Sequence, residues 1–188
     1  MVLLILGVLL WACVHFIPSV GASARARFIE QRGEGPYKGL FSLGLLVAMG
    51  LMIVGWRSAE PSVLYAVPAW SRWAANLLMV AALLLFLGSG VPTNLKRFLR
   101  HPQLTGVATW AGAHLLANGD SRSLVLFGGL GVWAVLEIIL INRRDGAWEK
   151  PEPLPLSADV TPLIAAAVAF AVLLFVHPWI SGVSGMPG

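Results

Sequence analysis

The chain has 188 residues, of which 57% are hydrophobic and only 12% are charged, and its mean hydropathy is +0.79. A soluble domain carries about 25% charged residues, so this composition excludes a soluble globular protein. The net charge of +4 does not indicate a nucleic acid partner, because the basic residues stand in short segments between apolar blocks, as in proteins oriented in a bilayer. The single cysteine, Cys13, excludes an internal disulfide and a cysteine metal cluster.

Six apolar blocks follow one another along the chain, at residues 1–20, 39–56, 70–88, 103–118, 123–141 and 162–181. A helix needs about 20 residues to cross the ~30 Å hydrocarbon core, and all six blocks approach this length, the fourth being the shortest. An open sheet cannot cross lipid, because the hydrogen bonds of its edges would be unmet. The sequence therefore predicts an all-α, polytopic integral membrane bundle of about six transmembrane helices, forming a single domain over residues 1–188.

Ten of the thirteen Lys and Arg residues fall in the first, third and fifth segments between these blocks. Basic residues concentrate on the cytoplasmic side of a membrane protein, so these segments are predicted to face the cytoplasm and both termini to face outward. Residues 1–24 are not predicted to be a cleaved signal peptide, because the positive charge follows the apolar run instead of preceding it. The chain is therefore predicted to cross a membrane several times.

The four histidines fall into two groups by their predicted depth. His15 lies near the cytoplasmic end of the first helix, and His101 begins the fourth helix at the same side. His114 lies thirteen residues further along, about 20 Å away and rotated by roughly 220°, so one metal ion cannot take both histidines of the fourth helix. His177 lies near the outer end of the last helix. Each pair could hold a metal or a haem, and the alternative, which is stronger for the outer pair, is that the histidines only hydrogen-bond backbone carbonyls or water.

Glu137 is a second polar residue in an apolar stretch, about 9 Å along its helix from Arg143. An acid at that depth is expected to face the bundle and to find a partner. The sequence therefore predicts a cluster of Glu137 with His15, His101 and Arg100 near the cytoplasmic side. A basic rim at the same level consists of Arg25, Arg27, Lys38 and Arg97. This rim suits anionic groups such as haem propionates, although orientation in the bilayer explains it without a ligand.

Two stretches, "CVHFIPSVGASAR" at 13–25 and "RHPQLTGVATWAGAHLLANGD" at 100–120, resemble the NnrU family of bacterial membrane proteins, as does the six-span layout. The resemblance covers most of the chain and implies a link to denitrification and nitric oxide metabolism. The family is related to 15-cis-zeta-carotene isomerase, an integral membrane enzyme that uses haem b held by two histidines. The ligand-bearing motifs of that isomerase correspond to His15 and His101 here.

The stretch "RHPQLTG" also resembles the RHPxYxG pattern of membrane methyltransferases of the isoprenylcysteine carboxyl and phospholipid type. In those enzymes the arginine and the histidine help to hold S-adenosylmethionine. Leu104 replaces the tyrosine, and the paired glutamates expected near the end are interrupted, since Glu149 and Glu152 are not adjacent. Methylation is therefore the weaker alternative.

These features together predict a haem b protein of the inner membrane, with His15 and His101 as axial ligands of the iron and Glu137 orienting a ligand imidazole. The basic residues expected to contact the propionates are Arg25, Arg97 and Arg100. An iron that one histidine can release would respond to redox state or nitric oxide, or would isomerise a hydrophobic polyene. The competing class is a membrane factor without a cofactor that supports denitrification without being an enzyme.

Overall fold

The computed structural model describes residues 1–182, and apart from one isolated bridge between Val63 and Asp120, the regular structure of these residues is helical. Five helical stretches are long and apolar enough to cross a membrane: Val2–Val20, Glu34–Ser58, Ser71–Gly88, Ser121–Asp145 and Leu156–Ser181. Many of their large apolar side chains are exposed, as expected where lipid replaces water around a helix. The prediction of an all-α, multi-pass membrane protein is confirmed.

The chain forms two compact units. The first unit combines Met1–Tyr65 with Asp120–Gly146, and the second combines Ala66–Gly119 with the chain from Ala147 on. The helices of the first unit are α1 (Val2–Val20), α2 (Ala22–Arg32), α3 (Glu34–Ser58), α7 (Ser121–Ser123), the π-helical η1 (Leu124–Gly128) and α8 (Gly129–Asp145). Those of the second unit are α4 (Ser71–Gly88), α5 (Leu95–Phe98), α6 (Pro102–Ala117), the 3-10 turn η2 (Leu156–Asp159) and α9 (Val160–Ser181).

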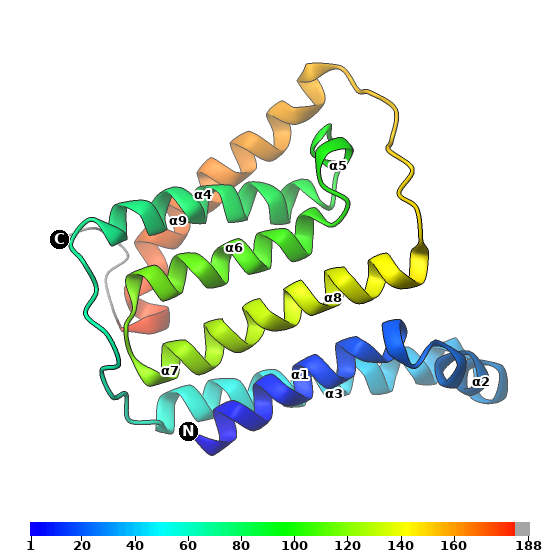
Figure 1. Cartoon of the computed structure of the whole chain (residues 1–188), viewed down its shortest axis with the longest axis horizontal. Helices are drawn as coiled ribbons and strands as arrows, with labels where there is room; N and C mark the ends of the chain where they lie inside the picture. Colours follow the sequence, from blue (N-terminus) through cyan, green and yellow to red (C-terminus); the bar gives the residue numbers. More distant parts are fainter. Residues whose placement is uncertain (183–188) are drawn as a thin grey trace. The chain divides into compact units, whose positions relative to one another are not determined.

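In the first unit, α1 and α3 run side by side in opposite directions (Figure 1). Their backbones meet at glycines: a Cβ atom on Gly7 would lie 2.7 Å from the backbone nitrogen of Met52, and one on Gly55 would overlap the backbone of Leu4. Small residues allow such close approach, which is how helices gain packing energy where lipid offers no hydrophobic driving force. The α1–α3 pair is therefore held by backbone contact.

The segment between the first two predicted spans is helical, which corrects its interpretation as a loop. Residues Ala22–Arg32 form α2, and α3 begins at Glu34, five residues before the predicted start of the second span. The residues of α2 are good helix formers, and Gly33, with φ at +89°, makes the turn into α3 that a side chain would strain. The basic residues expected in a loop therefore lie along a helix.

The start of the Ser121–Asp145 stretch is fixed by Asp120. One of its carboxylate oxygens accepts the backbone N–H groups of Arg122 and Ser123, at 2.9 and 3.1 Å, and the other accepts the Ser123 hydroxyl at 2.6 Å. Partial burial raises the pKa of Asp120, but the hydrogen bonds from Ser123 and Arg122 and the Arg122 charge outweigh it, so this pKa lies below its ordinary value. The Arg122 guanidinium also lies 4.6 Å from the centroid of the Trp56 ring, which ties this helix end to α3.

In the second unit, α4 and α6 lie side by side (Figure 1) and also approach closely at a glycine. A Cβ atom on Gly106 would lie 2.9 Å from the carbonyl oxygen of Ala82 and 3.0 Å from the backbone nitrogen of Phe86. Helix α6 begins with Pro102, which suits a first helical turn, and its 16 residues make it shorter than the five stretches above. It corresponds to the fourth predicted span but is not one of those five stretches. The total of six spans therefore stays a prediction.

Asp159 joins the linker before α9 to the segment after α4. Its carboxylate accepts the Thr93 hydroxyl at 2.5 Å and the Asn94 backbone N–H at 2.8 Å, and the Asn94 side chain also bonds the backbone of Leu154. Residues 147–155 contain no regular structure, as the proline-rich "EKPEPLPL" predicts. This connection orders a linker that has no helix of its own.

The glycine contacts predict a position-dependent cost for adding one methyl group. We expect Gly55→Ala and Gly106→Ala to destabilise the protein by about 1–3 kcal/mol, because the new Cβ meets backbone atoms that cannot move away. The matched controls are Gly50→Ala on α3 and Gly112→Ala on α6, where nothing lies within 4 Å of the new atom. Thermal unfolding midpoints of the four purified variants in detergent measure the difference, and equal midpoints within each helix would contradict the packing.

The lowered pKa of Asp120 predicts that the protein loses stability in acid. Because its folded-state pKa is lowered, its contribution is present in full above about pH 3.9, the ordinary aspartate value, and is lost as the pH falls through the lower folded-state pKa. Asp120→Asn removes this step, and Asp120→Ala also removes the cap, which costs about 1 kcal/mol. Unfolding midpoints across an acid pH series measure both effects, with the exposed Glu60→Gln as control. An Asp120→Asn variant that lost stability in parallel with the wild type would refute the assignment.

Candidate functional site

His15 of α1 has a fixed orientation in the first unit. Its ring nitrogen Nδ1 lies 3.0 Å from the backbone carbonyl oxygen of Trp11, one turn earlier in the helix. A carbonyl oxygen only accepts hydrogen bonds, so Nδ1 carries the proton and Nε2 carries the lone pair. Histidines that bind metals are usually held in this way, with the other ring nitrogen donating to a carbonyl. The half-buried His15 therefore has the tautomer that can bind a metal through Nε2.

Three aromatic side chains surround the His15 ring. The ring centroids of Trp11 and Trp133 lie 4.5 and 4.6 Å from that of His15, and the Phe41 centroid lies 5.7 Å away. These side chains come from α1, α8 and α3, so every transmembrane helix of the first unit contributes one wall. Flat aromatic walls exclude water and suit a flat or apolar ligand.

Glu137 lies on α8 in the same unit and is only 6% exposed. Its Oε1 atom accepts the Ser19 hydroxyl at 2.5 Å, whereas its Oε2 atom is buried without a hydrogen-bond partner among the described residues. The indole N–H groups of Trp11 and Trp133 are likewise buried and unpartnered. Buried polar atoms are nearly always bonded, so three orphaned atoms around one histidine mark a place where a further group is expected.

The structure divides the other predicted site residues between the units. Arg25, on α2 of the first unit, lies over the Tyr37 ring at 5.1 Å, and its Nε atom is buried without a partner. Arg97 of the second unit donates to the carbonyl of Pro151 at 3.2 Å. His101, directly after Arg100, stands at the N-cap of α6, where its carbonyl accepts the backbone N–H and the hydroxyl of Thr105. Of the predicted cluster, the first unit contains His15 and Glu137, and the second contains Arg100 and His101.

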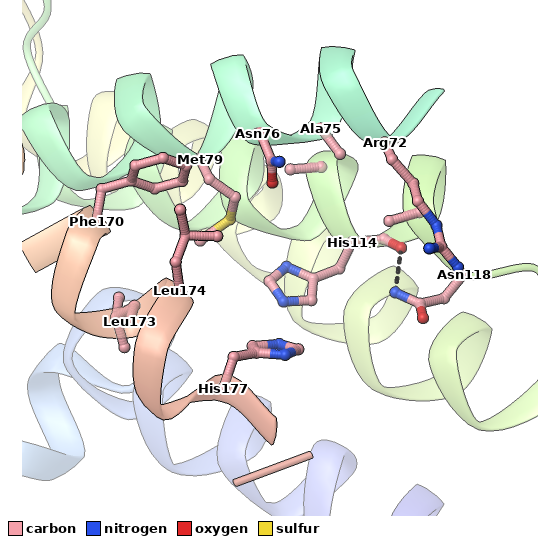
Figure 2. Close-up of a pocket in the computed structure, with 12 residues that line it drawn as sticks. Arg72, Ala75, Asn76, Met79, His114, Asn118, Phe170, Leu173, Leu174 and His177 are labelled. Atoms are coloured by element: carbon pink, nitrogen blue, oxygen red, sulfur yellow. Dashed lines mark hydrogen bonds between the residues drawn. The ribbon is translucent and has the colours of Figure 1, made fainter. Parts of the chain in front are cut away.

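A cavity of about 100 Å³ in the second unit contains the other two histidines, His114 of α6 and His177 of α9 (Figure 2). Helix α4 provides a third wall, where Arg72, Asn76 and Met79 follow one another at helical spacing. These three residues were not predicted from the sequence, although their i, i+4, i+7 pattern places them on one helix face. Within residues 1–182, there is no group of three or more His, Cys, Asp or Glu side chains that could hold a metal ion.

His114 has the same local arrangement as His15. Its Nδ1 atom lies 2.9 Å from the carbonyl oxygen of Trp110, and the two ring centroids lie 4.9 Å apart. The signal for this likeness is present in the sequence, since Trp11–His15 reads "WACVH" and Trp110–His114 reads "WAGAH". Each unit therefore contains one histidine tethered to the tryptophan of the preceding turn.

The Ser19–Glu137 hydrogen bond predicts a measurable loss on deletion. Ser19→Ala leaves both oxygens of a buried carboxyl group without a hydrogen-bond partner among the described residues and is expected to cost about 1–3 kcal/mol. The matched control is Ser58→Ala, because Ser58 is exposed in the same unit and its hydroxyl makes only a 3.5 Å contact. Unfolding midpoints in detergent compare the two, and an equal loss for both would show that Ser19 does not hold Glu137.

No match to this chain was found among curated proteins or among solved structures. The family described as NnrU protein matches residues 3–185, which is nearly the whole chain. This match agrees with the resemblance in the two histidine-bearing stretches and with the multi-pass helical fold. The chain is a member of the NnrU family of membrane proteins.

Proposed function

We propose that this protein binds haem b, with His15 as an axial ligand of the iron, and that it acts as a redox- or gas-responsive membrane protein in denitrification and nitric oxide metabolism. The observation that carries the proposal is the His15 environment. An imidazole with its Nδ1–H on a backbone carbonyl stands among aromatic rings, beside three buried polar atoms that lack partners. Axial imidazoles, aromatic walls and nearby hydrogen-bond donors are the means by which proteins hold haem and set its potential.

The residues around His15 each have a distinct part in this proposal. Trp11 fixes the imidazole through its carbonyl oxygen, and its indole, together with that of Trp133, keeps water from the ring. Glu137, held by Ser19, places its second carboxyl oxygen where it can accept a hydrogen bond or balance positive charge. Bound haem would supply an iron whose redox state and gas ligands the protein can sense.

The second ligand and the propionate partners remain sequence-based proposals. His101 is the second ligand indicated by the resemblance to the isomerase, and it belongs to the second unit together with Arg97 and Arg100. Arg25 belongs to the unit of His15 and has a buried Nε–H to offer a carboxylate. Guanidinium groups bind carboxylates through paired hydrogen bonds, which fits a propionate.

The enzymatic form of the proposal is isomerisation of a hydrophobic polyene, in keeping with the relationship to the carotene isomerase. Its substrate would reach the protein from lipid, since exposed apolar side chains cover the membrane helices. The non-enzymatic form, response to nitric oxide or redox state, needs only the haem and a ligand that the iron can exchange. We favour the second form, because it requires the histidine environment alone, whereas isomerisation also requires a binding site for the polyene.

The test is the absorption spectrum of the full chain, expressed with ample haem and purified in detergent. We expect a Soret band that His15→Ala abolishes or shifts, because the iron loses an axial ligand. His101→Ala should shift the same band if it supplies the second ligand. Cys13→Ala is the matched control, since Cys13 is exposed on the same helix, and it should preserve the band. Glu137→Gln should shift the reduction potential without removing the band.

Two outcomes would reject the proposal. The first is a wild-type protein of native helix content that binds no haem under these conditions, which would favour a membrane factor without a cofactor. The second is a His15→Ala variant with an unchanged spectrum and potential. Binding of S-adenosylmethionine that is lost in Arg100→Ala would instead support the methyltransferase alternative.

A further inference from the structure

We propose that the cavity in the second unit binds a short-chain aliphatic monocarboxylate, with the carboxylate group paired to Arg72 and the alkyl chain held between α4, α6 and α9. All three helices line this cavity, whose volume is about 100 Å³ (Figure 2). None of the residues proposed above to hold the haem lies among the described residues that line it. The inference is therefore independent of the proposed function.

The cavity is polar at one end and apolar at the other. Along α4, Arg72 stands seven residues before Met79, and along α9, Phe170 stands seven residues before His177. Seven residues of helix span about 10 Å, so the two ends of the cavity are well separated. Figure 2 shows Arg72 and Asn118 at one end and Phe170 at the opposite end. A ligand that fits this lining has a polar head and an apolar tail.

Arg72 gives the polar end its charge. It is the only Asp, Glu, Lys or Arg side chain among the described residues that line the cavity, and it makes no ion pair with a described residue. A guanidinium group without a counter-ion attracts an anion, and it binds a carboxylate through two parallel hydrogen bonds. Arg72 is exposed, which places it at the mouth of the cavity, where a carboxylate keeps part of its water.

The single positive charge of Arg72 favours a monoanion. A dianion, such as a phosphate monoester, would leave a negative charge uncompensated beside an apolar cavity, which is costly. A carboxylate carries one negative charge at neutral pH, because carboxylic acids have pKa values of about 4. Inorganic monoanions such as nitrate have the same charge but no part that would fill the apolar end.

The uncharged polar side chains at the same end already have partners in the protein. Nδ1 of His114 donates to the carbonyl oxygen of Trp110, and the Asn118 amide donates to the His114 carbonyl, both at 2.9 Å (Figure 2). These bonds hold the last turns of α6 and stay intact when a carboxylate binds at Arg72. The inference thus depends on the charge of Arg72 and on the shape of the cavity.

The apolar end limits the length of the tail. It is lined by Met79, Phe170, Leu173 and Leu174. A cavity of ~150 Å³ admits benzene, so a volume of about 100 Å³ leaves room for an alkyl chain of about three or four carbons. Each CH₂ group buried there strengthens binding about fourfold. Butyrate, a four-carbon carboxylate, fits both the length and the charge of the cavity.

The experiment measures unfolding midpoints of the full chain in an uncharged detergent against ligand concentration, at constant ionic strength, which gives the affinity for each ligand. We expect butyrate to raise the midpoint saturably. Acetate, and butanol, which has the tail without the charge, should each bind about tenfold more weakly or worse. In Arg72→Gln the affinity for butyrate should fall about 10- to 100-fold, because the charged hydrogen bonds are lost. Arg57→Gln is the matched control, because Arg57 is an exposed arginine of α3 in the first unit.

A second variant tests the apolar end without changing Arg72. Leu174→Ala enlarges this end and should shift the preference from butyrate toward hexanoate about tenfold, because two more CH₂ groups are buried. A purely structural role of Leu174 would weaken both carboxylates equally. Helix content and the unfolding midpoint without ligand show whether each variant is folded.

The outcomes separate the charge, the tail and the fold. A wild-type midpoint that butyrate leaves unchanged, or a butyrate affinity that Arg72→Gln leaves unchanged at native helix content, overturns the site. Equal binding of butyrate and butanol overturns the role of the charge, and equal binding of butyrate and nitrate overturns the role of the tail. Saturable butyrate binding that Arg72→Gln loses and Arg57→Gln keeps supports the proposal. If the wild-type protein binds no haem and still binds butyrate, this site stands while the proposed function fails.

Discussion

Close contact between helix backbones at glycine is the interaction on which the described structure depends. In each unit, the helix that carries a tethered histidine packs its backbone directly on a neighbour: α1 on α3 through Gly7 and Gly55, and α6 on α4 through Gly106. In lipid there is no hydrophobic gain from bringing helices together, so van der Waals contact must supply the stability. A histidine placed on such a rigid pair has a well-defined position, which a metal or haem ligand requires.

The second feature common to both units is the way in which the helix backbone orients an imidazole. His15 and His114 each donate from Nδ1 to the tryptophan carbonyl four residues earlier, and each ring lies against that tryptophan. An i−4 carbonyl already accepts the helix hydrogen bond, and its second lone pair takes the imidazole without breaking the helix. A polar side chain is thereby accommodated in an apolar helix with one ring nitrogen satisfied by its own backbone.

The side chains that surround the two histidines differ. His15 has indole rings around it and shares its unit with the buried Glu137, and this is the environment in which we propose that haem binds. His114 has a second imidazole, a thioether and a guanidinium around a small cavity. One protein of the NnrU family thus contains two differently built histidine environments, one in each compact unit.

The sequence by itself determined that the chain is an all-α membrane protein, because no other structure satisfies the backbone polar groups of such long apolar blocks. It also singled out His15 and Glu137 as polar residues in apolar stretches, which the structure places in one unit. Only the tertiary structure decided that Ser19 is the partner of Glu137, that Ala22–Arg32 is helical, and that α4 provides Met79 to the histidines of α6 and α9. The reason is that helical periodicity determines which residues share a face of a helix. A face toward lipid and a face toward another helix have the same apolar composition, however. The sequence of a helix therefore does not show which other helices it contacts.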